Sequence, residues 1–527
     1  MSAAPPKVNK WIVTLSISFG TLMGAIDSSI VNVALPQIRG TVGATVQEIT
    51  WISTGYAIAL VVVMPLTAFL ARQFGQKRVY MFCLALFLVG SALCGMATNL
   101  TTLVIFRAIQ GLGAGALQPT EQAILRQTFP LKEQGMAMAL FGMAVMLGPA
   151  VGPTLGGYIV DHWHWSWIFF INLPIGLIGL AMVATFVHED PELRAANAKI
   201  AAEQRKHLDW QGIALLSVGM ATLEFLLEEG SSHDWFESKL ICGCAAVAAV
   251  AIAAFIIREL SARAPAVNIR LFKDPVFSSG TLIGGLMFAM LMSNMFLLPI
   301  FMQELLGFSA TQSGLSLMPR TLVMMVAVPI VGRIYNRVDP RLFIAFGVLM
   351  FVAGAFDLAH LNLDSGSAHI VAAIAVQGVG FACLFVPLTT LALATIPRHL
   401  LTDATGLNSL VRQVGGAIGL AVFASRIGVY ATEARGSLFA HITETSPQVQ
   451  ERLAMIQGGL IARGMDAASA HMASIASLYG TVVKQSMVLS FDRIFMLSGF
   501  LFLLVLPLLF LLRPPPALTS SGPIHLE

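Results

Sequence analysis

Charged residues are scarce in this chain of 527 residues. Asp, Glu, Lys and Arg together make up 11% of it and hydrophobic residues 56%, whereas an ordinary soluble domain is about one quarter charged. A soluble fold could not bury so much apolar surface. The composition therefore predicts an integral membrane protein.

The sequence also lacks the patterns that mark several other protein classes. Its five cysteines lie inside apolar runs, without metal-ligand spacing or a disulfide framework. It contains no Walker loop, metal cluster or nucleophile triad, so we expect neither an enzyme nor a bound cofactor. The net charge of +3 is small for this length, which does not suggest a nucleic-acid partner. The segments between apolar runs are too short for a receptor domain.

Long apolar runs recur along the whole chain. Each contains about twenty residues, enough to cross the ~30 Å hydrocarbon core as a helix, and none shows the ten-residue alternation of a membrane β-barrel. We therefore predict an all-α integral membrane fold with 14 transmembrane helices. The predicted spans lie near 11–35, 49–71, 79–97, 102–125, 135–158, 167–187, 210–229, 240–257, 276–303, 312–332, 342–361, 368–392, 405–427 and 490–512.

Lys and Arg are concentrated in alternate loops, which the positive-inside rule places in the cytoplasm. With an even number of spans, both termini are then cytoplasmic. The first span contains Asp27 and no small-x-small cleavage site, so we do not expect a removable signal peptide. The basic loops carry Arg72, Lys77, Arg78, Arg126, Lys132, Arg258, Arg263, Arg270, Lys273, Arg333, Arg337 and Arg341.

An internal repeat with an offset of 267 residues divides the chain. It pairs Gln110 with Gln377 and Gly148 with Gly415. Two parallel six-helix repeats define the major facilitator fold. We predict a first half at 1–187, two inserted helices with flanking loops at 188–275, a second half at 276–512 that includes an external loop at 428–489, and a cytoplasmic tail at 513–527.

Asp27 in the first span and Arg107 in the fourth are candidates for proton coupling, together with Gln110. Counted at 1.5 Å per residue, both charges lie about 12 Å below the outer interface, so an ion pair between them is geometrically possible. Charges at membrane depth usually face a bundle interior or an aqueous cavity and serve transport. The alternative is a static structural pair.

Small residues line one face of the fifth span. Gly148, Gly152 and Gly156 recur at i, i+4 and i+8, with Pro149, Pro153 and Gly157 interleaved. Such a face permits close helix contact and hinge-like distortion. From the residues alone, this pattern indicates packing.

Several motifs resemble those of one transporter family. They are Asp27-Ser-Ser-Ile-Val-Asn32-Val-Ala-Leu-Pro36, Arg107-Ala-Ile-Gln110-Gly111-Leu-Gly113, Arg412-Gln413-Val-Gly415-Gly416 and the Gly-Pro pattern of the fifth span. Together with 14 spans, they are similar to the EmrB/QacA-type drug:proton antiporters of the major facilitator superfamily. The long last external loop resembles the EmrB-like branch.

The resemblance implies a function and a location. It implies proton-coupled export of small hydrophobic or amphipathic toxic compounds from the bacterial inner membrane, driven by the proton gradient without a cofactor. It further implies a periplasmic adaptor protein and an outer-membrane channel as partners, and the six Gly and Pro residues as an antiporter motif. The alternative is a proton-coupled exporter of one endogenous metabolite, lipid precursor or siderophore.

The loop between the second and third spans departs from the superfamily motif. Ala68 and Arg72 stand where the motif has Gly and Asp, although Gly75, Lys77 and Arg78 match it. We expect its latching of the cytoplasmic gate to be weakened, or transferred to the related loop of the second half. That loop contains Gly332, Arg333, Arg337, Asp339 and Arg341. The alternative for all these charges is simple positive-inside topology.

Four further polar residues are candidates for the substrate cavity: Asn32, Gln118, Glu121 and Arg412. Glu121 follows Arg107 by fourteen residues, which returns to nearly the same helical face. In the last external loop, Leu453, Ile456, Leu460 and Ile461 lie near helical spacing. That segment either binds a partner protein or folds back over the transporter's own outer surface.

Overall fold

The computed structural model describes residues 9–189, 191–206, 209–262, 265–443, 446–510 and 512. Within these ranges the chain forms helices and no strand, and 14 helices are long and apolar enough to cross a membrane. The predicted all-α membrane fold is therefore confirmed. The predicted tail 513–527 and Arg263 lie outside the described residues.

The first half of the bundle contains six membrane-crossing segments, some of them broken into two or three helices. Its elements are α1 (Lys10–Val42), α2 (Val46–Ile49), α3 (Trp51–Val63), η1 (Met64–Leu66), α4 (Thr67–Phe74), α5 (Gln76–Gly95), α6 (Leu100–Ala114), α7 (Leu117–Thr128), α8 (Gln134–His162), α9 (Trp167–Phe170) and α10 (Asn172–Phe186).

The remaining elements form the insertion and the second half. The insertion contains α11 (Pro191–Lys206), α12 (Trp210–Glu229) and α13 (Lys239–Ser261). The second half contains α14 (Pro275–Ile300), which continues as the π-helix η6 (Phe301–Leu305), α15 (Ala310–Ile334), α16 (Pro340–Leu358), α17 (Ser367–Leu391), η8 (Arg398–Leu400), α18 (Leu401–His441), α19 (Pro447–Ala462), α20 (Ala467–Leu503) and α21 (Val505–Leu508).

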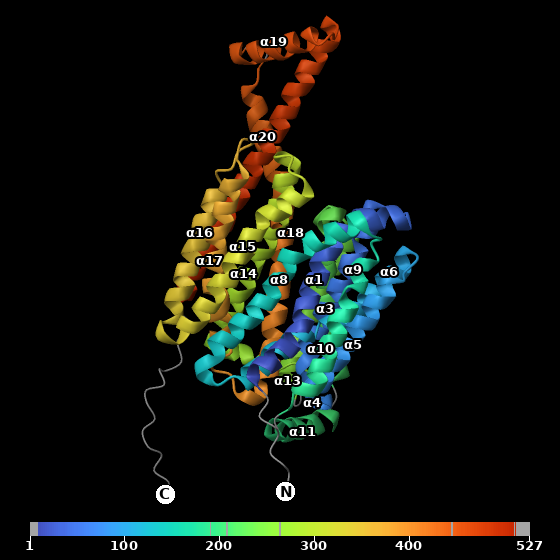
Figure 1. Ribbon diagram of the computed structural model, residues 1–527, viewed down its shortest axis with the longest axis vertical. Helices are drawn as coiled ribbons and strands as arrows, with labels where there is room; N and C mark the ends of the chain where they lie inside the picture. Colours follow the sequence, from blue (N-terminus) through green and yellow to red (C-terminus); the bar gives the residue numbers. More distant parts are fainter. Residues whose placement is uncertain are drawn as a thin grey trace.

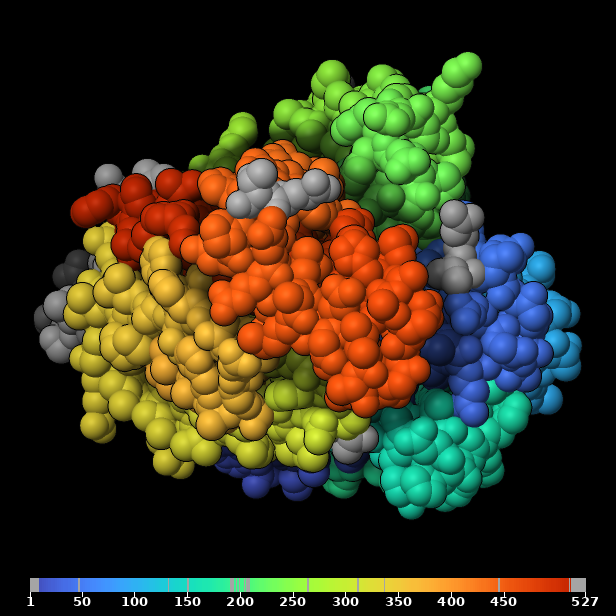
Figure 2. Space-filling view, turned by 90° about the horizontal axis from the view of Figure 1, so that it is seen from above, coloured from blue at the N-terminus to red at the C-terminus, as the bar shows by residue number. Residues whose placement is uncertain are grey.

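The two halves stand side by side, with one end of the bundle at the top of Figure 1. We call this upper end the hairpin end, because α18, α19 and α20 project from it. The opposite end is the basic end, since it carries the turn before Gln76 and the loops around Lys132 and Arg341. Viewed from the hairpin end, α12 and α13 form a green ridge beside the two halves (Figure 2).

The halves contact each other along α8 and α15. A Cβ atom added to Gly332 of α15 would lie 3.0 Å from the carbonyl oxygen of Gly135 in α8. Both described chain ends lie at the basic end, where Lys10 forms an ion pair with Glu133 and Arg341 donates to the carbonyl oxygen of Leu512.

The first helix is longer than its sequence predicts. Pro36 lies inside α1 rather than at its end, because membrane helices tolerate proline. Asp27 is therefore 17 residues after Lys10 and 15 before Val42, about 25 Å and about 22 Å from the two helix ends. It lies near the middle of α1.

The predicted external loop 428–489 is largely helical. The last turns of α18 and the first turns of α20 extend past the bundle as two antiparallel arms, and α19 crosses their tips (Figure 1). The predicted apolar face of α19 is partly covered by α20. Its residues Leu453, Ile456 and Leu460 are half-buried, while Ile461 is 45% exposed.

Candidate functional site

The Asp27 carboxylate lies at the centre of a buried polar cluster in the first half. Arg107 Nη1 donates to Asp27 Oδ2 at 2.6 Å, and Gln110 Nε2 donates to Asp27 Oδ1 at 2.9 Å. Arg107 Nη1 also donates to Gln110 Oε1 at 2.8 Å. Because Arg107 and Gln110 are three residues apart in α6, they share one helix face. The structure thus brings together all three predicted proton-coupling residues.

The Arg107 guanidinium is enclosed on its other sides. Its Nε donates to the carbonyl oxygen of Ile52 in α3 at 3.2 Å, and its Cζ lies 4.2 Å from the centre of the Tyr56 ring. Asp27 is 0% and Arg107 1% exposed. Water therefore does not screen their attraction, and loss of either charge would leave the other buried without its ion-pair partner.

Asn172 also belongs to this cluster, although it is not among the residues predicted from the sequence. Its Nδ2 donates to Asp27 Oδ1 at 3.1 Å and to Ser91 Oγ at 3.0 Å. The predicted span 167–187 breaks at Ile171, so that Asn172 is the first residue of α10. An amide at membrane depth inside an apolar run was the available signal.

The glycines of α8 contact the stretch of α1 that contains Asp27. Cβ atoms added to Gly148, Gly152 and Gly156 would collide with Ala25, Ser29 and Ile30 respectively. Ser29 Oγ also donates to the carbonyl oxygen of Gly148 at 3.0 Å. These three glycines therefore permit backbone-to-backbone contact between the two helices.

The other three residues of the predicted antiporter motif lie differently. Gly157 has open space where a Cβ atom would stand, and Pro153 is half-buried. The backbone of Pro149 belongs to α8, whereas its side chain lies outside the described part of the structure. Helix α8 continues through both prolines without a break.

At the basic end, the latch between the halves differs from the expected one. Arg72 Nη1 forms an ion pair with Asp403 Oδ2 of α18 at 2.5 Å, and Gln76 Nε2 donates to Thr402 Oγ1 at 2.6 Å. Arg72 stands where the superfamily motif has Asp, and its partner in the other half is acidic. A cross-half ion pair thus forms at the position where the departure from the motif predicts a weakened or transferred latch.

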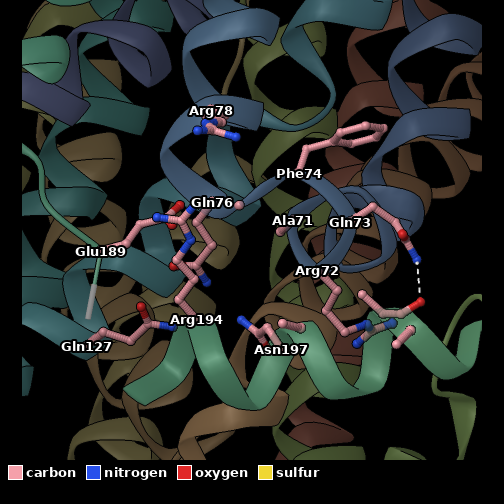
Figure 3. Close-up of a pocket in the computed structure, with 14 residues that line it drawn as sticks. Ala71, Arg72, Gln73, Phe74, Gln76, Arg78, Gln127, Glu189, Arg194 and Asn197 are labelled. Atoms are coloured by element: carbon pink, nitrogen blue, oxygen red, sulfur yellow. Dashed lines mark hydrogen bonds between the residues drawn. The ribbon is translucent and has the colours of Figure 1, made fainter. Parts of the chain in front are cut away.

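Two of the three matching residues of that loop, Gly75 and Arg78, line a pocket at the basic end, and Lys77 lies between them in the sequence. Gly75 has a φ angle of +92°, which favours glycine, and a Cβ atom there would collide with Glu189. The Lys77 backbone N–H donates to Glu189 Oε1 at 2.7 Å. Figure 3 shows Arg78 beside this pocket and α11 beneath it, with Gln73 bonded to the Ala201 carbonyl at 3.4 Å.

The related loop of the second half makes no described ion pair across the halves. Gly332 packs on α8, while Arg333 and Arg337 are exposed. The Arg341 backbone N–H donates to Asp339 Oδ1 at 2.9 Å, which caps α16. Of the predicted gate residues in this loop, Gly332 alone lies at the contact between the halves within the described chain.

The four predicted cavity residues do not form one cluster. Asn32 is exposed and accepts from Ser53 Oγ at 3.2 Å, and Gln118 is half-buried. Glu121 is fully buried in α7 and accepts from Ser18 Oγ at 3.1 Å. Arg412 of α18 is buried at the boundary of the halves, where its Nη2 donates to Gln122 Oε1 at 3.4 Å.

Comparisons with known proteins add independent information. The chain matches the model of the Major Facilitator Superfamily over residues 17–420. It is 32% identical over 514 residues to the multidrug export protein EmrB of Escherichia coli (strain K12), covering 97% of each chain. It is 33% identical over 504 residues to the fatty acid resistance protein FarB of Neisseria gonorrhoeae, covering 95% of this chain and 96% of the relative.

Solved structures share the architecture at lower sequence identity. The crystal structure of the human organic anion transporter MFSD10 (TETRAN) has a TM-score of 0.59 and 14% identity, covering 95% of this chain and 100% of that one. This likeness concerns the fold.

Proposed function

Because the chain belongs to the Major Facilitator Superfamily and, within it, to the EmrB-type export proteins, we propose that it is a proton-coupled multidrug efflux antiporter. Its substrates are small hydrophobic or amphipathic toxic compounds, and the proton gradient drives it without a cofactor. The observation that carries the proposal is the Asp27 carboxylate, which is 0% exposed in the middle of a membrane helix and bonded to Arg107.

Proton binding to Asp27 changes the electrostatics of the cluster. The ionised carboxylate is stabilised by Arg107 and by two amide donors, Gln110 and Asn172. Protonation removes the charge that offsets the buried guanidinium, and an uncompensated buried charge is costly. The Arg107 guanidinium is then stabilised by moving toward water or another hydrogen-bond acceptor. This movement requires the helices around it to shift.

Alternating exposure of a central site accounts for transport. The Arg72–Asp403 ion pair and the Gln76–Thr402 hydrogen bond join the halves at the basic end. Substrate would enter from the basic end after these contacts break. Its release at the hairpin end would then complete export. The positive-inside rule then places the basic end in the cytoplasm and the hairpin end in the periplasm of a bacterial inner membrane.

Replacement of Asp27 by Asn tests this function. In proteoliposomes with an imposed pH gradient, the wild-type chain should exchange a fluorescent dye such as ethidium for protons. Asp27→Asn keeps the side-chain volume but removes the titrating group, so exchange should cease while the protein remains folded. Asp357→Asn is the control, because this acid is exposed and bonded to His369. Normal exchange by Asp27→Asn would exclude Asp27 as the coupling group.

The hairpin end supports a further part of the proposal, a periplasmic adaptor that leads to an outer-membrane channel. Met455 of α19 is 62% exposed and Met472 of α20 69%, and both lie on elements beyond the bundle. Exposed apolar side chains on a projecting element suit a partner protein.

The substitutions Met455→Glu and Met472→Glu test the adaptor. Together they should abolish drug resistance in intact cells and leave exchange in proteoliposomes intact, because the transport helices are untouched. Loss of exchange in vesicles would instead assign the hairpin a role in the transporter itself. Unchanged resistance would exclude these side chains from adaptor binding.

A further inference from the structure

Arg412 is a buried cation without a described counter-ion. Its side chain is 4% exposed, and its Nη1 atom has no hydrogen-bond partner in the described structure. No carboxylate of the described chain lies within 4.0 Å of it. The nearby acid Glu121 accepts instead from Ser18. An uncompensated buried charge is expensive, so an anion placed beside Arg412 would be stabilised there.

Three aromatic rings surround this guanidinium. Its Cζ lies 5.3 Å from the ring centre of Phe288, 5.8 Å from that of Phe385 and 5.9 Å from that of Phe141. Phe141 belongs to the first half and the other two to the second. The rings attract the cation and also offer an apolar surface, so the site combines one positive charge with aromatic walls.

Small residues border the arginine. A narrow cavity borders Arg412, Gly280 and Gly284 of α14 and Thr389 of α17. A Cβ atom added to Gly284 would lie 3.7 Å from Arg412 Cγ. The site is closed in this arrangement, because the stem of Arg412 is in van der Waals contact with Gly284. An anion can reach Nη1 only when the halves separate at the basic end.

The site lies above the closed end of the bundle. Arg412 follows Asp403 of the basic-end ion pair by nine residues in α18, about 14 Å along the helix axis. Breaking the Arg72–Asp403 pair would therefore open the path from the basic end toward Arg412. The 3.4 Å contact of Arg412 Nη2 with Gln122 joins the two halves and would break in the same movement.

We propose that Arg412 binds the anionic group of amphipathic organic acids, with Phe141, Phe288 and Phe385 holding their apolar parts. This inference rests on the proposed export function and names a substrate class for it. The guanidinium donates to a carboxylate or a similar acid group when the basic end is open. When the halves close there, the Gln122 amide oxygen returns to the guanidinium and displaces the anion.

Binding of three probe molecules that each carry a ten-carbon chain tests the proposal. Decanoate, decanol and decyltrimethylammonium differ in head-group charge, and their dissociation constants are measured at pH 7.5 with the full chain in lipid nanodiscs, after subtraction of uptake by empty nanodiscs. Wild-type protein should bind decanoate at least tenfold more tightly than decanol. Arg412→Gln should reduce this preference to near unity, and Arg412→Lys should retain part of it.

Arg320→Gln is the matched control. Arg320 of α15 is also 4% exposed and has two nitrogen atoms without partners in the described structure, but it has no aromatic neighbours of this kind. It should keep the wild-type preference for decanoate. An Arg412→Gln protein that still prefers decanoate, or a wild-type protein without that preference, would overturn the proposal. Since binding is measured without a gradient, this result is separate from the Asp27→Asn transport result.

Discussion

The ion pair between Arg72 and Asp403 should control how often the basic end is open. Both side chains are nearly buried, at 7% and 1% exposure, and they belong to opposite halves. Removal of one partner from a buried ion pair costs about 3–5 kcal/mol. Arg72→Ala should therefore destabilise the closed arrangement by about 3 kcal/mol, which changes the ratio of closed to open molecules by roughly 100-fold.

Spin-label distances can measure this change. Phe74→Cys of α4 and His399→Cys of η8 place labels on exposed positions of opposite halves at the basic end, in a chain whose five native cysteines are replaced. The wild-type pair should give a short distance, and Arg72→Ala should shift most molecules to a longer one. Because the rest of the contact is unchanged, the doubly reversed chain Arg72→Asp with Asp403→Arg should recover the short distance.

Two results would refute this reasoning. If Arg72→Ala leaves the distance distribution unchanged, the ion pair does not decide the equilibrium, and the contact of α8 with α15 must hold the halves together. The single reversals Arg72→Asp and Asp403→Arg are measured as well. If each lengthens the distance and the doubly reversed chain does not restore it, local packing rather than charge attraction stabilises the contact. A double-mutant cycle separates these two terms.

Two further outcomes are expected in the first half. Gly152→Leu should strongly reduce exchange in proteoliposomes and Gly157→Leu should not, because a Cβ atom at Gly152 meets Ser29 while the space beside Gly157 is open; equal activities would exclude close α1–α8 contact as a requirement. Asn172→Ala should reduce exchange in proteoliposomes, because it removes a donor that holds the Asp27 carboxylate in place beside Arg107; unchanged exchange would exclude this hydrogen bond as a requirement.

The sequence was sufficient to predict the fold, because membrane spans are local features. An apolar run of about twenty residues forms a helix wherever it stands in the bundle, and the order of runs determines the topology. The cluster of Asp27, Arg107 and Gln110 could be predicted from the sequence for a related reason. Arg107 and Gln110 share a helix face through their spacing, and charged residues inside apolar runs are few enough to pair by depth.

Contacts between distant segments could not be predicted from the sequence in this way. The partner of Arg72 lies 331 positions away, and no local pattern distinguishes it from other acids at the basic end. Gln377 repeats Gln110 in sequence, yet its side chain has no hydrogen-bond partner in the described structure. The same residue at a repeated position thus has a different role, because its neighbours come from other helices.

Helix α8 physically links the Asp27 cluster to the boundary of the halves. On one face, Gly148 and Gly152 contact Ala25 and Ser29, which precede and follow Asp27 in α1. On another, Gly135 contacts α15 of the second half. Because no side chain separates these backbones, a change in the tilt of α8 against α15 must displace the turn of α1 that holds the carboxylate. Movement of the halves and the hydrogen bonding of Asp27 therefore depend on the position of the same helix, as coupled exchange requires.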